Sequence, residues 1–234
     1  MSAYGFIFAR GGSKGLLNKN LKDFCGKPLI AWSIEQALSI KSIKRVIVST
    51  DSIEIADISK RYGAEVPFIR PPELATDESP EWLSWQHALN YISEKEKYLP
   101  DFMVSIPSTS PLRSSSDVEK CLDLIRDNEN TDVVITVTEA SRNPYFNIVT
   151  YKKDGYVDLF VPNNNISRRQ DAPSVFDITT VAYVARSEFV LNNSSIFEGN
   201  VSAVEVSKDS SIDIDTQIDF DIAEFLFKKR KING

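Results

Sequence analysis

The sequence contains few of the residues on which histidine or cysteine chemistry depends. Among 234 residues, histidine occurs once, as His87, and cysteine twice, as Cys25 and Cys121. A single histidine disfavours histidine acid–base catalysis and a histidine metal site. Two cysteines give no disulfide framework, so we expect two packed thiols in a reducing, cytoplasmic setting.

Long apolar runs and an excess of positive charge are also missing. No window approaches the roughly 20 apolar residues that a membrane-spanning helix needs, and the opening MSAYGFIFARGG lacks the pattern of a signal peptide. The net charge of -6 disfavours charge-driven binding to nucleic acid. We expect no membrane or nucleic acid partner, and a local basic cluster must hold any anionic ligand.

Short apolar segments alternate with amphipathic segments along most of the chain. This pattern predicts an α/β fold with a doubly wound, mostly parallel sheet flanked by helices. The expected strands are 4–9, 45–50, 102–106, 132–137, 180–184 and 201–206, and the expected helices are 28–38, 52–62, 80–92, 116–125 and 217–229. Ser116 and Glu119 have the spacing of a capping box for one of these helices.

The pattern changes after Glu139. A turn at Asp154 and Gly155, followed by alternating apolar residues over 156–161, indicates a hairpin rather than another strand–helix unit. We therefore predict an α/β domain of residues 1–139 and 179–234, interrupted by a small insertion of residues 140–178.

The segment ARGGSKG, residues 9–15, directly follows the first expected strand. Its glycines allow successive backbone amides to point at phosphate oxygens, and Arg10, Lys14 and Lys19 add positive charge that suits a triphosphate. The spacing matches neither the P-loop nor the dinucleotide-binding pattern. On composition alone, a glycine turn with solvated basic residues would look similar.

Two aspartates near the C-terminus form a second candidate site. Asp213 and Asp215 are separated by one residue, which on a strand places both carboxylates on one face. Such a pair suits magnesium, which takes its remaining ligands from phosphates and water. A solvated strand edge or turn explains an isolated pair as well. Asp219 fits a capping or surface charge, and Asp51 fits either a ligand site or a helix N-cap.

The segment ARGGSKGLLNKN, with Gly26, Lys27 and Pro28 after it, resembles the opening of the acylneuraminate cytidylyltransferase (CMP-sialic acid synthetase) family. That family includes CMP-legionaminate and related nonulosonate cytidylyltransferases. The resemblance continues in family order through STDS, YGAEVPFIRP, TSPLR, RRQD and IDIDT. It implies a fold of the nucleotide-diphospho-sugar transferase type with a small inserted dimerisation subdomain. It also implies magnesium-dependent transfer of CMP from CTP to an acidic nine-carbon or related sugar.

The resemblance implies roles for the residues at matching positions. The residues expected to bind the nucleotide are Arg10, Gly11, Gly12, Ser13, Lys14, Lys19 and Asn20, with Arg70 and Ser79 beside the cytosine. Those expected to act in catalysis are Lys14, Lys19 and Asp213, and those expected to hold Mg²⁺ are Asp213 and Asp215. Those expected to bind the sugar are Thr109, Ser110, Arg113, Arg168, Arg169 and Gln170.

Arginine suits the sugar side because its planar fork can meet both oxygens of a carboxylate. The resemblance further implies a homodimer in which the insertion reaches the partner's active site. Two departures leave the sugar open: Pro107 replaces a glutamine, and Thr179 with Thr180 replaces an Asn-Gly. The candidates are N-acetylneuraminate, its deaminated analogue, legionaminate, pseudaminate and an eight-carbon relative.

Three other functions stay as alternatives. A nucleotide-sugar glycosyltransferase often has an Asp-x-Asp motif, but that motif usually ends a strand in the middle of the chain. A non-catalytic nucleotide-binding module would not need the lysines and aspartates that are present. A nucleotidyltransferase acting on a neutral sugar phosphate usually has a different glycine loop and would leave the RRQD segment unexplained.

Overall fold

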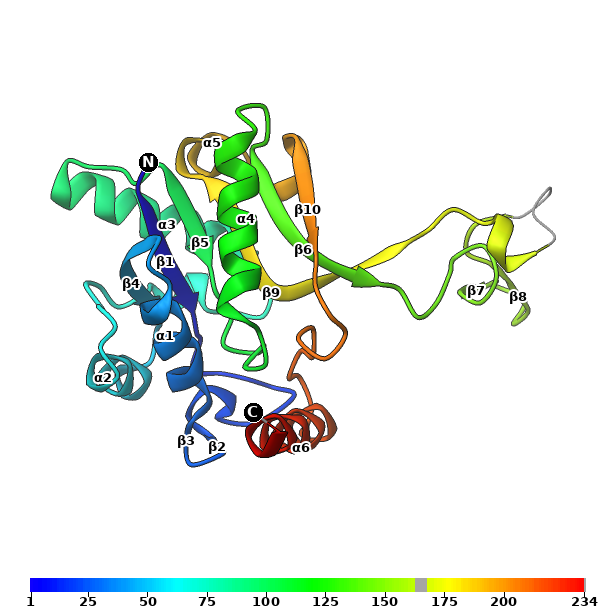
Figure 1. Cartoon of the computed structure of the whole chain (residues 1–234), viewed down its shortest axis with the longest axis horizontal. Coiled ribbons are helices and arrows are strands. Elements are labelled where there is room, and N and C mark those ends of the chain that lie inside the picture. Colours follow the sequence, from blue (N-terminus) through cyan, green and yellow to red (C-terminus); the bar gives the residue numbers. More distant parts are fainter. Residues whose placement is uncertain (163–167, 234) are drawn as a thin grey trace.

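A six-stranded sheet forms the centre of the computed structural model, which describes residues 1–162 and 168–233 apart from the side chains of Arg169, Lys231 and Asn233 (Figure 1). The strands lie in the order β10-β6-β9-β5-β1-β4. Their bounds are β1 (Ala3–Phe8), β4 (Ile43–Ser49), β5 (Phe102–Ser105), β6 (Val133–Glu139), β9 (Phe176–Arg186) and β10 (Val201–Glu205). Only β9 runs antiparallel to its neighbours in this sheet, so the sheet is mostly parallel, as predicted.

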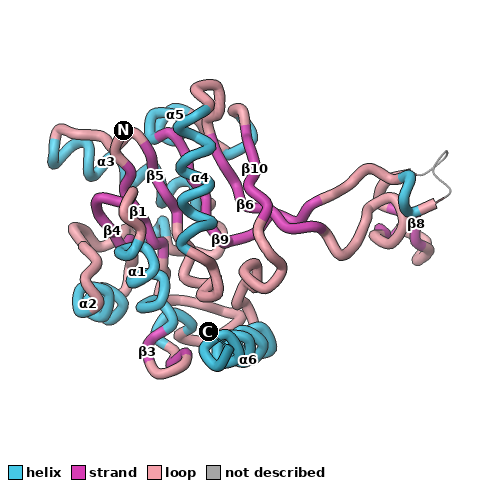
Figure 2. The backbone as a smooth tube through the Cα atoms, in the orientation of Figure 1, coloured by secondary structure: helices cyan, strands magenta, loops and turns pink. Residues whose placement is uncertain are grey.

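Helices cover both faces of the sheet (Figure 2). Their bounds are α1 (Leu29–Ser39), α2 (Ile53–Arg61), α3 (Glu81–Glu96), α4 (Ser115–Asp127) and α5 (Ser187–Asn192). Apolar residues of α1, α2 and α4 form one core cluster with Ile7, whereas those of α3 and α5 form another with Phe6. Phe6 and Ile7 are consecutive in β1 and pack into different clusters, because side chains alternate between the two faces of a strand. This arrangement confirms the predicted doubly wound α/β fold.

The C-terminal helix α6 (Gln217–Asn233) lies at the end of the sheet where β1 and β5 finish (Figure 1). It packs against the short hairpin formed by β2 (Asp23–Phe24) and β3 (Lys27–Pro28). The ring of Phe24 stands at 5.4 Å and near right angles to those of Phe220 and Phe227. This packing brings the end of the chain back to the loop after β1. No helix in the described part of the chain is long and apolar enough to cross a membrane.

Two helix starts show how local hydrogen bonds fix the loops around the sheet. Ser52 caps α2 by accepting a hydrogen bond from the Ile55 amide at 3.3 Å, which leaves Asp51 for another contact. The capping box of α4 consists of Ser114 and Asp117. The pairing of Ser116 with Glu119 was therefore wrong, because Ser116 is already inside the helix.

An arm projects from the body between β6 and β9 (Figure 1). The two strands pair as far as Glu139 and Phe176, so β9 begins four residues before the predicted strand at 180. The arm carries β7 (Val149–Tyr151) and β8 (Val157–Leu159), which pair antiparallel. Gly155 adopts a φ of +89° in the turn between them, so the predicted hairpin is present. The arm lies within the segment 140–178.

Candidate active site

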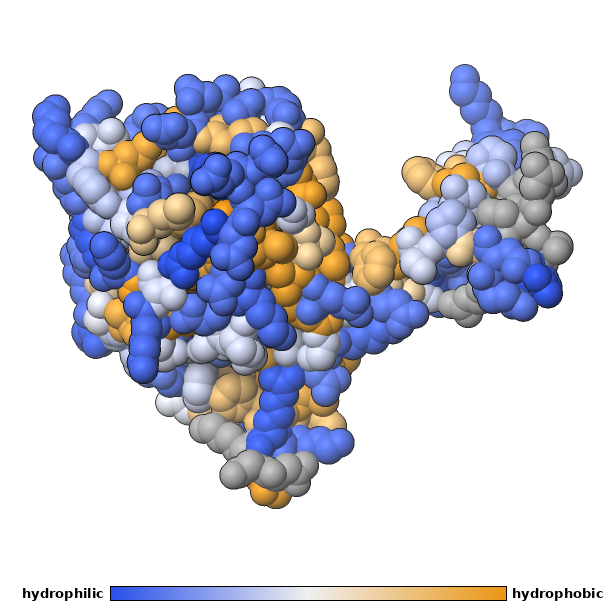
Figure 3. Space-filling model, turned by 45° about the horizontal axis from the view of Figure 1, so that its top comes forward, coloured by the Kyte–Doolittle hydropathy of each residue, from blue (hydrophilic) through white to orange (hydrophobic). Residues whose placement is uncertain are grey.

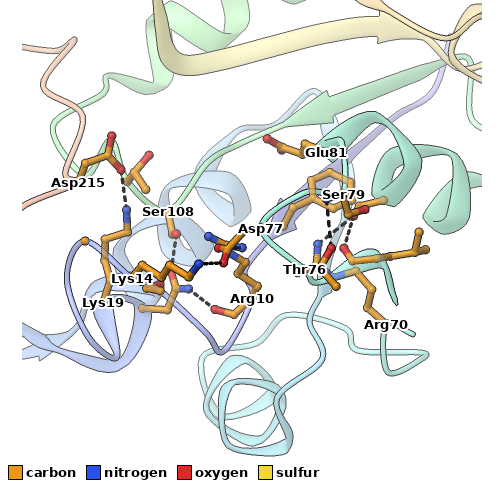
Figure 4. Close-up of a pocket in the computed structure, with 17 residues that line it drawn as sticks. Arg10, Lys14, Lys19, Arg70, Thr76, Asp77, Ser79, Glu81, Ser108 and Asp215 are labelled. Atoms are coloured by element: carbon orange, nitrogen blue, oxygen red, sulfur yellow. Dashed lines mark hydrogen bonds and ion pairs between the residues drawn. The ribbon is translucent and has the colours of Figure 1, made fainter. Parts of the chain in front are cut away.

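A cavity of about 450 Å³ lies at the carboxyl ends of β1 and β5. Strand β1 has β4 on one side and β5 on the other, and such a reversal of strand order is where α/β proteins bind ligands. The walls come from the loop after β1, the segment 70–84, the loop after β5 and the segment before α6 (Figure 4). The cavity therefore gathers four segments that are far apart in the sequence.

Hydrogen bonds to neighbouring strand ends hold the glycine loop in place. The Gly11 amide donates to Asp51 Oδ1 at 2.9 Å. Asn20 donates to the Arg10 carbonyl at 3.1 Å and accepts from the Ser108 hydroxyl at 2.6 Å. Asp51 is thus a loop anchor, not the helix cap. The predicted nucleotide residues that line the cavity are Arg10, Ser13, Lys14, Lys19, Asn20, Arg70 and Ser79, whereas Gly11 and Gly12 lie outside its lining.

Basic side chains converge at one end of the cavity, as predicted, but an aspartate pairs with two of them. Asp77 forms an ion pair with Arg10 at 2.6 Å and a second with Lys14. Hydrogen bonds from Lys14 and Arg10 hold the pKa of Asp77 below its usual value. Asp77 was not among the predicted residues. In this structure Asp77 neutralises two of the cationic side chains that would pair with the phosphates of a triphosphate.

Lys19 connects the loop after β1 with the segment before α6. Its ammonium group donates to the Ile214 carbonyl at 2.5 Å and pairs with Asp215 Oδ1 at 3.0 Å. The Lys19 side chain is only 12% exposed, whereas that of Asp215 is 72% exposed. The glycine loop and the Asp-x-Asp segment therefore form one site (Figure 4).

Asp213 and Asp215 lie in an extended segment between β10 and α6 that is not part of a strand, contrary to the prediction. The segment is tied to the loop after β5 by the Ile214 amide, which donates to the Thr109 carbonyl at 2.9 Å. Burial raises the pKa of Asp213; hydrogen bonding from Thr109 opposes this rise, and the charge of Asp215 adds to it. The Oδ1 atom of Asp213 is buried and has no hydrogen-bond partner among the described residues.

These two carboxylates fit a magnesium ion. A buried carboxylate oxygen without a partner and an exposed carboxylate beside it provide the hard oxygen ligands that Mg²⁺ prefers. Within the described ranges, no group of three or more His, Cys, Asp or Glu residues lies placed to hold a metal. Asp219 instead caps α6, as predicted, by accepting from the Thr216 amide at 2.8 Å and hydroxyl at 2.7 Å.

Polar atoms without partners line the opposite end of the cavity. Arg70 is 4% exposed, and its Nη1 donates to Ser84 Oγ at 3.0 Å. Its Nε and Nη2 atoms, like Ser79 Oγ, are buried and have no hydrogen-bond partner in the described part of the chain. Burial lowers the pKa of Arg70. A ligand that offers acceptors at this end would satisfy these donors.

Glu81 lines the same end of the cavity and was not predicted. Its Oε1 accepts a hydrogen bond from Trp85 Nε1 at 3.1 Å. Desolvation of the carboxyl group by the surrounding protein raises the pKa of Glu81, although the residue as a whole is exposed. Its place in the cavity could not be predicted from the sequence, because Glu81 is the first residue of α3, where an acidic residue is common.

The predicted sugar-binding residues of the TSPLR segment separate into two groups. Thr109 lines the cavity, and the hydroxyl of Ser110 bonds to that of Thr180 at 2.7 Å. Arg113 is 4% exposed. Its guanidinium donates to the Val181 carbonyl and to Ser33 Oγ, both at 2.8 Å, and to the Pro107 carbonyl. The structure therefore corrects the prediction for Arg113, whose side chain supports the loop after β5.

The remaining predicted sugar residues belong to the arm (Figure 1), and none of them lines the cavity. Arg168 pairs through Nε and Nη2 with both carboxylate oxygens of Asp171, at 2.8 and 2.9 Å. Gln170 is exposed in the short helix 169–171. The side chain of Arg169 lies outside the described residues. One chain alone does not bring these residues to its cavity.

Comparisons with known proteins show the family to which this chain belongs. The family model described as "Cytidylyltransferase" matches residues 4–230. The "Post-translational flagellin modification protein B" of Campylobacter coli is 37% identical over 97% of this chain and 96% of its own. The "CMP-N,N'-diacetyllegionaminic acid synthase" of Campylobacter jejuni is 36% identical over 97% of this chain and 95% of its own.

A solved structure shares the fold. A CMP:2-keto-3-deoxy-manno-octonic acid synthetase complexed with CTP aligns with a TM-score of 0.74 at 20% identity, covering 98% of this chain and 100% of the other. The family match spans the glycine loop, the cavity and the paired aspartates alike. The chain therefore belongs to the cytidylyltransferase family.

Proposed function

We propose that this protein transfers CMP from CTP to the anomeric hydroxyl of an acidic 2-keto sugar of the nonulosonate class and releases pyrophosphate. The observation that carries the proposal is the contact of Lys19 with Ile214 and Asp215, which joins a phosphate-type loop to a metal-type carboxylate pair in one cavity. The similar proteins named as a CMP-legionaminic acid synthase and a CTP-bound sugar acid synthetase support the same reaction.

The positive charge of Arg10, Lys14 and Lys19, which line one end of the cavity, supports binding of the triphosphate at that end. The sugar hydroxyl attacks the α-phosphorus in line and loses its proton to water. A new oxygen–phosphorus bond forms, and the bond to the bridging oxygen of the β-phosphate breaks, so that pyrophosphate leaves. Lys14 and Lys19 stabilise the negative charge that grows on the phosphates. The reaction needs no covalent intermediate with the protein.

Asp213 and Asp215 would hold the magnesium ion. When bound there, the ion would supply neutralisation of phosphate charge and a lower pKa for the attacking hydroxyl. Thr109 and Thr180 position the Asp213 carboxylate by hydrogen bonding. Buried Ile214 fixes the backbone between the two aspartates.

The acidic group of the sugar needs a cationic anchor, and the arginines of the arm are the candidates. Since the arm projects away from its own cavity, we propose that it serves the cavity of a second copy in a homodimer. Exposed apolar side chains on the arm support this interface, among them Tyr151 at 82%, Tyr156 at 72% and Phe160 at 65% exposure. Figure 3 shows hydrophobic surface both on the arm and on the side of the body from which the arm extends.

The test is release of pyrophosphate from CTP and Mg²⁺ with each of the five acidic sugars named above, followed by mass spectrometry of the product. We expect one sugar to give a CMP-sugar and stoichiometric pyrophosphate. Lys19→Ala and Asp213→Ala should abolish both. Binding of CTP without release of pyrophosphate in the presence of any of these sugars would favour a binding module. Transfer of the sugar from a CMP-sugar to an acceptor, with CMP as the leaving group, would favour a glycosyltransferase. We place the reaction in the cytoplasm, where CTP is available.

A further inference from the structure

We propose that His87 is a positioning residue for nucleotide binding: its neutral imidazole supports the cavity wall that carries Arg70, and protonation of the ring weakens the binding of CTP. The inference rests on the proposed function, because it takes the cavity to bind CTP. His87 does not line the cavity, so it acts through Arg70 and not by contact with the nucleotide.

The face of α3 that carries His87 and Tyr91 holds the segment 67–70 against the body. The Tyr91 hydroxyl donates a hydrogen bond to the Pro67 carbonyl at 2.8 Å. The ring of Phe68 meets that of His87 edge-on, with centroids 4.9 Å apart, and lies 4.8 Å from the ring of Tyr91. Since residues four apart on a helix are neighbours, the two rings of α3 form one surface under Phe68.

The same helix fixes Arg70. Ser84, three residues before His87, accepts a hydrogen bond from Arg70 Nη1 at 3.0 Å. The Arg70 amide donates to the Thr50 carbonyl at 2.8 Å, so the backbone and the side chain of Arg70 are both anchored. Because Phe68 lies only two residues before Arg70, a displacement of Phe68 from the His87 ring would also displace the guanidinium.

The surroundings of His87 suit a neutral ring. Its Nδ1 atom is buried and has no hydrogen-bond partner among the described residues. An imidazolium must donate through both ring nitrogens, whereas a neutral ring donates through one. Two charged groups face the ring: Arg70 disfavours the imidazolium and Glu73 favours it. Burial lowers the pKa of His87 and the charge of Arg70 adds to this, so the ring is mostly neutral at neutral pH.

Protonation of His87 would place a second positive charge beside Arg70. The Nε and Nη2 atoms of Arg70 are already buried without hydrogen-bond partners in the described chain. Like charges in a poorly solvated site repel each other, so the ring or the guanidinium must leave its place. The affinity for CTP should therefore fall as the pH falls through the pKa of His87. By linkage, bound CTP must lower that pKa.

The first test uses the fact that His87 is the only histidine of the chain. A single set of imidazole signals in the NMR spectrum of the untagged protein therefore reports its titration. The titration is recorded without ligand and with saturating CTP, in the absence of sugar. We expect CTP to lower the pKa of His87, with a fall in its proton affinity of about fivefold or more. An unchanged or raised pKa in the saturated protein would overturn the proposal.

The second test compares the native chain with His87→Gln, whose amide is polar but does not titrate. Calorimetry gives the affinity for CTP at about pH 7.5 and about pH 5, on either side of the ordinary histidine pKa. The terminal phosphate of CTP also titrates in this range, but it does so equally in both experiments. We expect the ratio of native to variant affinity to be lower at the acidic pH by about threefold or more. Equal ratios at the two pH values would overturn the proposal.

Two checks keep these outcomes separate. Melting temperatures at both pH values would show whether His87→Gln folds, and the NMR titration of the native protein does not depend on that variant. A native protein that binds no CTP at either pH would overturn this proposal together with the proposed function. Binding of CTP that leaves the pKa of His87 unchanged would overturn this proposal alone.

Discussion

The backbone carbonyl of Asp215 lies against the α-carbon of Gly15, so close that a β-carbon at position 15 would overlap it. Only glycine allows the loop after β1 and the segment before α6 to approach in this way. The contact sets the distance between the phosphate-binding loop and the paired aspartates. This contact explains why position 15 is a glycine, although glycine contributes no charge to the site.

Gly15→Ala should therefore push these two segments apart. We expect kcat/KM for CTP to fall about 10- to 100-fold, since misplacement by an ångström costs that much in a positioned reaction. The native chain is the reference, and the melting temperature of the variant would show whether it folds. Unchanged kcat/KM for CTP in the pyrophosphate assay would show that the Gly15 contact does not matter.

Asp213→Asn should give a protein that is more stable and inactive. The pKa of Asp213 is raised in the folded state, chiefly by burial, so the fold holds a proton there more tightly than the unfolded chain does. Above the ordinary aspartate pKa the ionised group therefore costs stability, and a neutral amide removes that cost. We expect a higher melting temperature at pH 7 and no turnover. A lower melting temperature would contradict this description of Asp213.

Asp77→Asn should release Arg10 and Lys14 from their ion pairs. Because a triphosphate must compete with the Asp77 carboxylate for these cations, we expect the KM for CTP to fall by about threefold to tenfold. The size of the effect should shrink in high salt, since Asp77 is exposed and its ion pairs are screened. A higher KM would mean that Asp77 helps to bind the nucleotide.

Phe160→Glu should weaken the proposed homodimer. Phe160 is 65% exposed on the arm, and a charge there would have to be buried in any interface that covers it. Light scattering during size exclusion should give a lower mass for this variant than for the native protein. Phe197→Glu changes a residue of equal exposure, 66%, in a short helix of the body, and should leave the mass unchanged. A native monomer would contradict the proposed dimer.

The sequence was sufficient to predict the fold because each strand and helix carries its own pattern. The apolar run at 45–50, for instance, corresponds to β4. Gly63, which was predicted to stop the preceding helix, follows the C-terminal end of α2 and has a φ of +93°. The long start of β9 was missed because Phe176, Asp177 and Ile178 are all exposed on the ribbon of the arm. Without one buried face, the alternation that marks a strand is weak.

The sequence predicted the residues of the glycine loop and of the Asp-x-Asp pair, but it did not predict that Asp77 and Glu81 line the same cavity. Glycine loops and Asp-x-Asp pairs are local patterns, so their residues could be named from the sequence. Asp77 and Glu81 act through contacts with Arg10 and Trp85 that only the folded chain creates. For Arg113 the resemblance implied a sugar contact, but its buried guanidinium donates to backbone carbonyls in this structure.

The most direct test of the proposed reaction follows one oxygen atom. The acidic sugar that supports turnover would carry ¹⁸O at its anomeric hydroxyl, and mass spectrometry would locate the label after reaction with CTP. We predict that the label is retained in the CMP-sugar, between the sugar and the phosphorus, and that the pyrophosphate carries none. Label in pyrophosphate, or a CMP-sugar without the label while the unreacted sugar still carries it, would contradict attack of the sugar hydroxyl on the α-phosphorus.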